Sequence, residues 1–314
     1  MTVPTAITIG NFDGVHLGHA ELVRTARKAV DTASRAGHVV VLSFDPHPLS
    51  VLRPQQVPPR LTDFKQRRRL LMEAGADRVL ALEPTRQFLG QTARDFITSM
   101  VRSHQPKVVI EGRDFRFGKA RAGTVDTLRE LGGQFGFETV VIEPVRATLS
   151  DHSSVVVSSS MIRWLIKRGR MDDAAKLLGH AHAIQGIVVR GDQRGRTIGV
   201  PTVNIDHGDL LLPADGIYAG TAERAGQRYP AAISVGTKPT FGEHPRLCEA
   251  HLLGYDGPLD DYGWEIRVTF DRWLRDQLTY TDVQSLKDQI SRDIAQVQRF
   301  ASQSPLNQML VQST

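Results

Sequence analysis

The sequence predicts two domains: an α/β domain built on a parallel sheet, and a small antiparallel β-barrel with a C-terminal helix. A chain of 314 residues is long enough for two ordinary domains. In its first half, strand-like apolar runs alternate with amphipathic helical stretches, which is typical of a parallel sheet with helices on both faces. From Ile184 onward, short β-like runs are broken by Gly and Pro, which favours a small barrel.

The first half contains five strand-like runs separated by helical stretches. The predicted strands are 6–9, 38–44, 78–82, 107–111 and 138–142, and the predicted helices are 20–36, 64–74, 92–104 and 124–131. One face of 20–36 is apolar and is predicted to be buried: Leu22, Val23, Ala26, Ala29, Val30 and Ala33. Ligands bind at the carboxyl ends of parallel strands, so the segments after 6–9 and 107–111 are expected on one edge.

The second half is predicted to hold five strands and a final helix. The strands are 184–190, 217–223, 231–235, 247–253 and 265–270. The helix has one apolar face, formed by Val283, Leu286, Ile290, Ile294 and Val297, and Asp282 is a plausible N-cap. The two halves are expected to join between Ser158 and His182 through helical stretches at 161–167 and 171–178, and the chain after Phe300 is expected to be loosely held.

Bulk composition narrows the class of protein only partly. The net charge of +5 is compatible with nucleic acid, a membrane surface or small anionic substrates as partners. The densest basic run, Lys65 and Arg67 to Arg69, is predicted to be a solvated helix face, and no nucleic-acid motif accompanies it. The single cysteine, Cys248, excludes an internal disulfide framework, and no apolar run is long enough to span a membrane. We therefore expect a soluble cytoplasmic protein without a secretory signal.

The segment 10–19 is the most informative stretch of the chain. It places two histidines, His16 and His19, between the strand 6–9 and the helix 20–36. Free backbone N–H groups and the positive end of the helix dipole favour anions at such a position. The H-x-G-H pattern is that of nucleotidyltransferases, so the segment predicts binding and polarisation of nucleotide phosphates.

Other nucleotide-binding and metal-binding motifs are absent or incomplete. No G-x-G-x-x-G follows a strand. The segment 112–119 has five residues between its glycines instead of four, and Ala120 stands where a P-loop has Ser or Thr. No His/Cys cluster has the spacing of a zinc site.

Three further segments of the first half carry a family resemblance. Ser-Phe-Asp-Pro-His-Pro at 43–48, Gly-Arg-Asp-Phe-Arg-Phe-Gly at 112–118 and Ser-Ser-Ser-Met-Ile-Arg at 158–163 follow 10–19 in this order. Together they closely resemble the adenylyltransferase domain of bacterial bifunctional riboflavin kinase/FAD synthetases. The resemblance covers nearly all of residues 1–180 and implies a Rossmann-like nucleotidyltransferase fold.

The second half resembles the same family independently. The segment 191–204 is similar to the riboflavin kinase motif, and the segments 215–218, 236–241, 249–251 and 262–263 follow in the family's order. The chain departs from the family at Asp45, where Glu is common, at Ser160, where Thr is usual, at Val203, which replaces Ala, and at Asp261, where an apolar residue is frequent. The larger side chain of Val203 lies next to the predicted metal ligands and can alter kinase efficiency.

The resemblance implies a transferase with two activities in flavin cofactor synthesis. Residues 181–314 would phosphorylate riboflavin with ATP, releasing ADP, and residues 1–180 would transfer an adenylyl group from ATP to FMN, releasing pyrophosphate and FAD. One alternative is that only one activity is retained, most readily FAD synthetase with a weak kinase. Another is a flavin-sensing regulator that binds nucleic acid, which the basic run would favour.

The resemblance also implies the ligands and the setting of the enzyme. These are riboflavin, FMN, FAD and ATP, with Mg²⁺ as cofactor and with neither nucleic acid nor a membrane as partner. A cytoplasmic monomer or weak homo-oligomer is expected.

For the adenylyl step, the FMN phosphate is already anionic, so no general base is needed. His16 and His19 are predicted to stabilise the transferred group as hydrogen-bond donors. The remaining predicted ATP-binding residues are Gly10, Asn11, Phe12, Gly18, Ser159 and Arg163. The resemblance places the flavin on Asp45, Pro46, His47, Pro48 and Asp114.

For the kinase step, the resemblance makes Glu249 the base that acts on the riboflavin hydroxyl. Thr202 and Asn204 offer hard oxygen ligands for Mg²⁺, and their i, i+2 spacing puts both on one face of a strand. The predicted ATP-binding residues of this domain are Gly191, Gly195, Arg196, Gly199 and Pro201.

Overall fold

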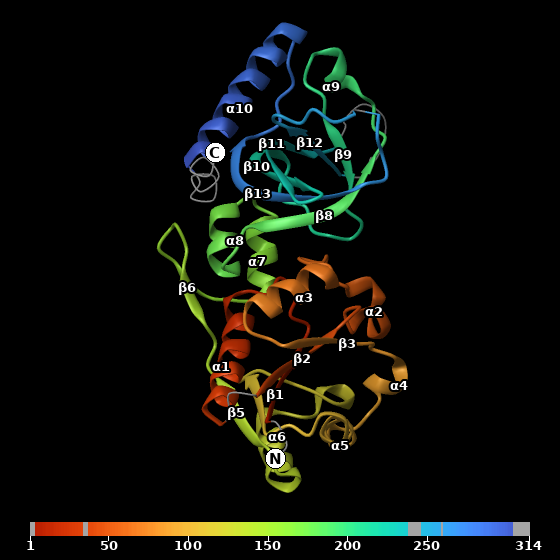
Figure 1. Cartoon of the computed structure of the whole chain (residues 1–314), viewed down its shortest axis with the longest axis vertical. Helices are drawn as coiled ribbons and strands as arrows, with labels where there is room; N and C mark the ends of the chain where they lie inside the picture. The colour runs from red at the N-terminus through yellow and green to blue at the C-terminus, as the bar shows by residue number, and fades with distance from the viewer. Residues whose placement is uncertain (1–3, 34–36, 238–245, 259, 304–314) are drawn as a thin grey trace. The chain divides into compact units, whose positions relative to one another are not determined.

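The computed structural model describes residues 4–33, 37–237, 246–258 and 260–303, and it divides into two compact units, Met1–Ser159 and Ser160–Thr314 (Figure 1). The first unit contains a five-stranded parallel sheet with the order β3-β2-β1-β4-β5. Its strands are β1 (Thr5–Gly10), β2 (His38–Phe44), β3 (Arg78–Leu82), β4 (Val108–Gly112) and β5 (Glu138–Ile142). The predicted parallel sheet is confirmed, and each predicted strand lies within one residue of its observed bounds.

Four longer helices cover this sheet, as predicted. They are α1 (Leu17–Ala33), α3 (Phe64–Glu73), α5 (Ala93–His104) and α6 (Val125–Phe135). Side chains at their starts fix where they begin: the Thr92 hydroxyl accepts from Asp95 N at 3.1 Å, and the Asp63 carboxylate accepts from Gln66 N at 2.6 Å. Short helical turns, α2 (Leu49–Leu52), η1 (Pro54–Gln56), α4 (Arg86–Leu89) and η2 (Lys119–Arg121), lie in the connections.

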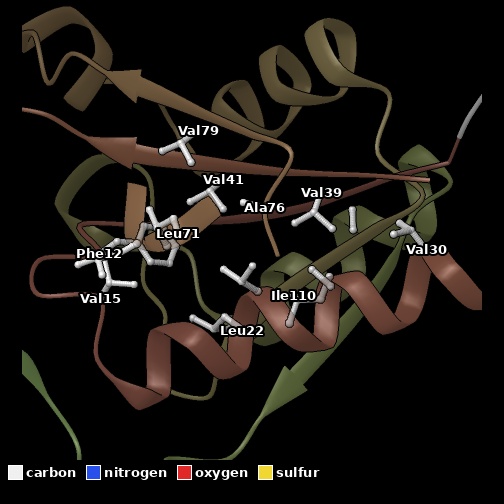
Figure 2. Close-up of a cluster of buried hydrophobic side chains, with 14 of the residues drawn as sticks. Phe12, Val15, Leu22, Val30, Val39, Val41, Leu71, Ala76, Val79 and Ile110 are labelled. Atoms are coloured by element: carbon white, nitrogen blue, oxygen red, sulfur yellow. The ribbon is translucent and has the colours of Figure 1, made fainter. Parts of the chain in front are cut away.

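The sheet is buried on both faces. On one face, Leu22 and Val30 of α1 and Leu71 of α3 pack against Val41 and Ile110 of the strands (Figure 2). On the other face, α5 and α6 cover the sheet through a second cluster: Ile7, Ile9, Val40, Leu42, Phe96, Ile97, Met100, Val109, Phe117, Leu128, Leu131 and Phe137. The alternating strand residues therefore serve two cores, which explains the nearly continuous apolar runs in the sequence.

Two short strands of the first unit were not predicted. β6 (Arg146–Thr148) and β7 (Ser154–Val156) form an antiparallel hairpin. Three-residue strands with exposed polar ends carry too little apolar alternation to be recognised in the sequence. The chain then enters α7 (Ser159–Ile166) and α8 (Met171–Leu178), the two predicted connecting helices.

The second unit contains a closed barrel of six strands in the order β10-β11-β12-β9-β8-β13. The strands are β8 (His182–Val189), β9 (Val203–Asp206), β10 (Gly216–Arg224), β11 (Gln227–Gly236), β12 (Leu247–Leu252) and β13 (Glu265–Arg275). The predicted barrel is confirmed, with β9 added to the five expected strands. β9 has only four residues and pairs with β8 and β12, so it completes the barrel although it lacks a strong apolar pattern of its own.

Helices flank the barrel. α8 packs against β8 and β13, the short α9 (Arg194–Thr197) lies between β8 and β9, and α10 (Val283–Gln303) packs against β10 and β11. The predicted cap is confirmed, because the Asp282 carboxylate accepts from Ser285 N at 2.8 Å. Residues 304–314, most of the segment expected to be loosely held, lie outside the described residues. Among the described helices, none combines the length and apolar character needed to cross a membrane.

A buried ion pair attaches α10 to β13. The Arg275 guanidinium contacts both carboxylate oxygens of Asp293 at 2.7–3.1 Å, and Asp293 is only 3% exposed. We expect Arg275→Met to lower the free energy of unfolding of the second unit by about 3 kcal/mol, because it leaves a buried carboxylate unpaired. Urea unfolding followed by tryptophan fluorescence measures this, since all three tryptophans lie in residues 160–314. The exposed Arg292→Met is the control, and equal stabilities of the two variants would contradict the prediction.

Candidate active sites

The loop between β1 and α1 holds the histidine motif at the carboxyl edge of the sheet. Phe12 and Val15 point into the core (Figure 2), with 1% and 4% of their surfaces exposed. Both have positive φ angles, 50° for Phe12 and 41° for Val15, in a region that is strained for residues with bulky side chains. Gly10 leaves room for this arrangement, since a Cβ there would lie 3.3 Å from the Phe12 ring. Burial of two apolar side chains thus holds a strained loop, and the side chain of Phe12 is directed away from any ligand at this edge.

The two histidines stack on each other at the start of α1. Their ring centroids are 3.6 Å apart with an interplanar angle of 16°, and His19 N donates to His16 Nδ1 at 3.3 Å. A Cβ at Gly18 would lie 3.2 Å from the His16 ring, so the glycine of H-x-G-H permits the stack. Desolvation lowers the pKa of His19 well below its ordinary value, and the neighbouring His16 and Arg67 lower it further. His19 is therefore neutral near pH 7 and can act as a hydrogen-bond donor.

Asp13 of the same loop organises the segment that precedes α3. Its carboxylate is buried and accepts hydrogen bonds from Leu61 N and Thr62 N at about 3.0 Å and from the Thr62 hydroxyl at 3.2 Å. Its backbone carbonyl accepts from the Ser159 hydroxyl at 2.8 Å. Ser159, a predicted ATP-binding residue, is therefore joined to the histidine loop. Arg163 lies four residues further along α7, in the second compact unit.

The predicted flavin segment follows β2 on the same edge. β1 and β2 are paired in register from Thr5↔His38 to Gly10↔Ser43, so the residues after Gly10 and after Phe44 lie close together. Asn11 Nδ2 and His47 Nε2 are 3.2 Å apart, which connects a predicted ATP-binding residue to a predicted flavin-binding one. The Asp45–Pro46 peptide is cis. The structure thus brings 45–48 beside the histidine loop.

Asp114 follows β4, on the other side of β1. Its carboxylate folds back over Gly112, where a Cβ would lie 3.2 Å from Asp114 Oδ1. The segments after β1 and β4 were expected on one edge of the sheet. This is confirmed, because β4 is the parallel neighbour of β1. The register of β1 and β4 is Ala6↔Val108 and Ile7↔Val109, so their backbone pairing ends before that edge.

Glu111 of β4 lies beside β1 and is not among the predicted site residues. Glu111 Oε1 accepts from Ile9 N at 2.7 Å, where the backbone pairing of the two strands has ended. The residue is 2% exposed. Burial raises the pKa of Glu111 well above its ordinary value, the charge of Asp114 raises it further, and the Ile9 N–H lowers it. In the folded protein, Glu111 therefore keeps its proton to a higher pH than an ordinary glutamate does.

One basic side chain does not fit the predicted solvated helix face. Lys65, Arg68 and Arg69 are exposed, but Gln66 and Arg67 are buried, so the prediction is wrong for that part of the run. The α3 helix contacts the sheet through Leu70 and Leu71, and Arg67 lies one helical turn before them. This spacing of Arg67, Leu70 and Leu71 can be seen in the sequence. The charged residues around Arg67 nevertheless favoured the prediction of an exposed face.

In the second unit, a glycine-containing loop packs directly onto the Pro-Thr-Val-Asn segment. A Cβ at Gly191 would lie 2.1 Å from Asn204 Nδ2. A Cβ at Gly195 would lie 2.3 Å from Val200 O, with the Thr202 hydroxyl 3.4 Å away. Gly199 has a φ of 83°, which favours glycine. The structure therefore brings the predicted ATP-binding loop against both predicted metal ligands.

A cavity of about 140 Å³ lies against this loop. Its lining includes the predicted residues Gly191, Arg196, Pro201, Thr202 and Asn204. Val203, the departure from the family pattern, also lines the cavity. Glu249 is not part of the lining, but on β12 it is paired with Asn204 of β9. Most of the predicted motif 236–241 lies outside the described residues.

Several residues of the cavity were not predicted. His251 Nδ1 is 2.7 Å from Pro201 O, which ties β12 to the Pro-Thr-Val-Asn segment. Asp261 and Trp264 also line the cavity, and the Arg224 guanidinium next to them donates to Asp261 at 2.7 Å and lies 4.1 Å from the Trp264 ring. Asp261, a departure from the family pattern, is thus balanced by a neighbouring cation. Such a pairing between the end of β10 and the loop before β13 has no local signal in the sequence.

The fold and these segments define a class of protein: a two-domain chain with an H-x-G-H motif at the edge of a parallel sheet and a barrel with a glycine-containing loop. The family model for FAD synthetase matches residues 2–160, and the model for riboflavin kinase matches residues 178–301. The chain belongs to the bifunctional riboflavin kinase/FMN adenylyltransferase family.

Individual relatives are similar to this chain over nearly its whole length. The bifunctional riboflavin kinase/FMN adenylyltransferase of Escherichia coli K12 is 35% identical over 91% of this chain and 90% of its own. That of Bacillus subtilis 168 is 30% identical over 95% and 93%. A solved structure from Streptococcus pneumoniae, titled a macrolide-efflux protein, shares 30% identity, covers 95% of each chain and has a TM-score of 0.82.

The contact between Gly191 and Asn204 can be tested by adding one methyl group. We expect Gly191→Ala to lower riboflavin phosphorylation by at least ten-fold, because the new Cβ displaces the Asn204 amide. FAD formation from supplied FMN should stay within two-fold of the unmodified protein. Gly133→Ala is the control, since a Cβ at Gly133 meets nothing within 4 Å. Unchanged phosphorylation by Gly191→Ala would contradict the predicted role of this loop.

The buried carboxyl of Glu111 predicts a pH dependence of stability. Its folded-state pKa lies above the ordinary 4.5, so its stabilising contribution is complete below pH 4.5 and is lost as pH rises through the folded-state pKa. Glu111→Gln keeps an acceptor for Ile9 N and does not titrate. We expect its melting temperature, relative to that of the unmodified protein, to rise between pH 5 and pH 8 in calorimetry. The exposed Glu138→Gln should show no such trend, and parallel curves for both variants would refute the assignment.

Proposed function

We propose that this chain phosphorylates riboflavin to FMN and then adenylylates FMN to FAD, using ATP in both steps. The proposal is carried by one observation: a single chain combines the stacked pair His16 and His19 at a strand edge with a glycine-lined barrel cavity next to Thr202 and Asn204. Membership of the bifunctional family supports both activities.

In the adenylyl step, an oxygen of the FMN phosphate attacks the α-phosphorus of ATP, and the bond to the β-phosphate breaks as pyrophosphate leaves. The reaction needs two anions in line and donors for the charge that develops. We assign His16 and His19 as those donors, consistent with the neutral state of His19. Gly10, Asn11, Phe12 and Gly18 would shape the nucleotide site through the loop backbone, with Ser159 and Arg163 adding phosphate contacts.

The flavin is assigned to the segment after β2 and to the loop after β4. The 3.2 Å approach of Asn11 to His47 supports a flavin position next to the nucleotide loop. Asp45, Pro46, His47 and Pro48 are the proposed flavin contacts on that side. Asp114 is the proposed contact on the far side of β1.

In the kinase step, the riboflavin hydroxyl attacks the γ-phosphorus of ATP, Glu249 accepts the proton, and ADP leaves. Gly191, Gly195, Arg196, Gly199 and Pro201 would hold the nucleotide in the barrel cavity. The pairing of Glu249 with Asn204 supports a base close to the proposed metal ligands.

Mg²⁺ is the proposed cofactor of this step. The hydroxyl of Thr202 and the amide oxygen of Asn204 are the hard oxygen donors that Mg²⁺ prefers, and Gly191 and Gly195 leave space beside them. When bound, Mg²⁺ would neutralise charge on the ATP phosphates. Among the described residues no cluster of three or more His, Cys, Asp or Glu could hold a metal ion.

The functional division is proposed at 180/181, with the adenylyltransferase in 1–180 and the kinase in 181–314. The division of the chain into two compact units falls between Ser159 and Ser160 instead. The segment between the two family matches, 161–177, contains most of α7 and α8. We further propose a cytoplasmic monomer or weak homo-oligomer without nucleic-acid or membrane partners.

A narrower function is a chain that retains only FAD synthesis. The observation that favours it is Val203, a residue of the cavity lining between the proposed metal ligands. Incubation with riboflavin, ATP and Mg²⁺ followed by chromatography of the flavins decides between the two. Accumulation of FAD supports both activities, whereas FAD from supplied FMN but not from riboflavin would leave the kinase inactive.

The two sites should be separable by substitution. We expect His16→Ala or His19→Ala to reduce FAD formation by at least 100-fold and to leave FMN formation within two-fold, since each removes a donor to the transferred phosphate. Glu249→Ala should do the reverse, with supplied FMN still adenylylated. Chromatography of riboflavin, FMN and FAD measures both products. Equal loss of both activities in a folded variant would be incompatible with two separate sites.

A further inference from the structure

Arg67 is a buried guanidinium next to the proposed adenylyl site. Only 3% of the residue is exposed, although Arg68 and Arg69 beside it in the sequence face solvent. Burial lowers the pKa of Arg67, and a buried charge is stable only when its neighbours compensate it. The groups that the Arg67 guanidinium bonds therefore indicate which segments it holds together.

One arm of the guanidinium reaches the end of β2. Arg67 Nη1 donates to Phe44 O at 2.8 Å and to the Ser43 hydroxyl at 3.3 Å. The Ser43 hydroxyl in turn donates to Asn11 O at 3.3 Å. Arg67 thus holds the carbonyl that directly precedes the flavin segment 45–48, and through Ser43 it reaches the first residue of the histidine loop.

The other arm reaches the segment that Asp13 binds. Arg67 Nη2 donates to Thr62 O at 3.3 Å and lies 3.8 Å from Asp45 Oδ1. Thr62 donates to the Asp13 carboxylate through its N–H and hydroxyl, and the Thr62 hydroxyl oxygen accepts from Gly14 N at 3.1 Å. The same guanidinium therefore touches the flavin segment directly and the histidine loop through Thr62.

We propose that Arg67 is a positioning residue for FMN adenylylation, which fixes the separation between the histidine loop 11–16 and the flavin segment 45–48. This proposal rests on the proposed function. In-line attack requires the reacting atoms within about 3–3.5 Å, and a displacement of about 1 Å can cost on the order of 100-fold in rate. The two segments follow the paired strands β1 and β2, and beyond the last pair, Gly10↔Ser43, Arg67 bonds groups on both sides.

The planar fork of arginine is essential to this role. It bonds Phe44 O with one nitrogen and Thr62 O with the other. The ammonium of lysine is a single point of charge on a flexible stem and does not reproduce this geometry. A role based on geometry therefore predicts that lysine fails to replace Arg67, whereas a role based on charge alone predicts that it succeeds.

The test compares Arg67→Met and Arg67→Lys with the exposed control Arg68→Met in the full chain. The steady-state kcat and the KM values for FMN and ATP are measured for FAD formation from supplied FMN. Riboflavin phosphorylation by the same chain serves as an internal control. Calorimetry follows the fold of the first unit, because 1–159 contains no tryptophan. We expect both Arg67 variants to lower kcat by at least ten-fold with KM values within three-fold, and phosphorylation to be unchanged.

Each other outcome overturns the proposal. Full activity in Arg67→Lys would assign Arg67 a charge role, and an increased KM for FMN at unchanged kcat would make it a binding residue. Unchanged kcat in Arg67→Met would remove any role in the reaction. If Arg67→Met loses the first unit's unfolding transition, Arg67→Lys alone decides by the same criteria, and its failure to fold as well would make Arg67 purely structural. Absence of FAD formation by the unmodified chain would instead refute the proposed function.

Discussion

The adenylyl site depends on a backbone conformation that the core enforces. Phe12, Gly14 and Val15 all have positive φ angles, and for Phe12 and Val15 this costs about 1–3 kcal/mol each. Burial of a large apolar side chain contributes about 1.5–3 kcal/mol, enough to offset that strain. Because Phe12 and Val15 are held in the core under α1, the chain turns sharply after β1. The turn places His16 directly before α1 and His19 within its first turn.

The other features of this edge follow from that turn. The turn directs the buried Asp13 toward the segment before α3. The hydrogen bonds that Asp13 accepts from Leu61 and Thr62 hold the start of α3 in position. Arg67 of α3 then reaches the end of β2. A chain of buried polar contacts thus links loops from separate strands, and several of its donors and acceptors are backbone groups.

The barrel site is built by a different means. There the chain approaches itself closely because side chains are missing: Gly191 lies against Asn204, and Gly195 lies against Val200. The strand β9 carries Asn204 next to Glu249 of β12. In one unit bulky residues fill space to shape a loop, and in the other glycines leave space so that polar groups can gather around a nucleotide.

The strands of the sheet could be predicted because their apolar runs are nearly continuous. The barrel could be predicted because Gly and Pro separate a series of short β-like runs. β9 was not among the expected strands, because its apolar–polar alternation extends over only four residues. Arg67 could not be separated from Arg68 and Arg69, because burial of a charge depends on partners that lie far away in the chain.

By itself, the sequence determined the two domains, the order of their elements and the family. These depend on local patterns and on motifs whose residues are adjacent in the chain. Only the tertiary structure decided which polar residues are buried, among them Asp13, Arg67 and Glu111. The physical reason is that the cost of burying a charge or a polar group is offset by hydrogen-bond partners from other strands, and those partners meet only after the chain has folded.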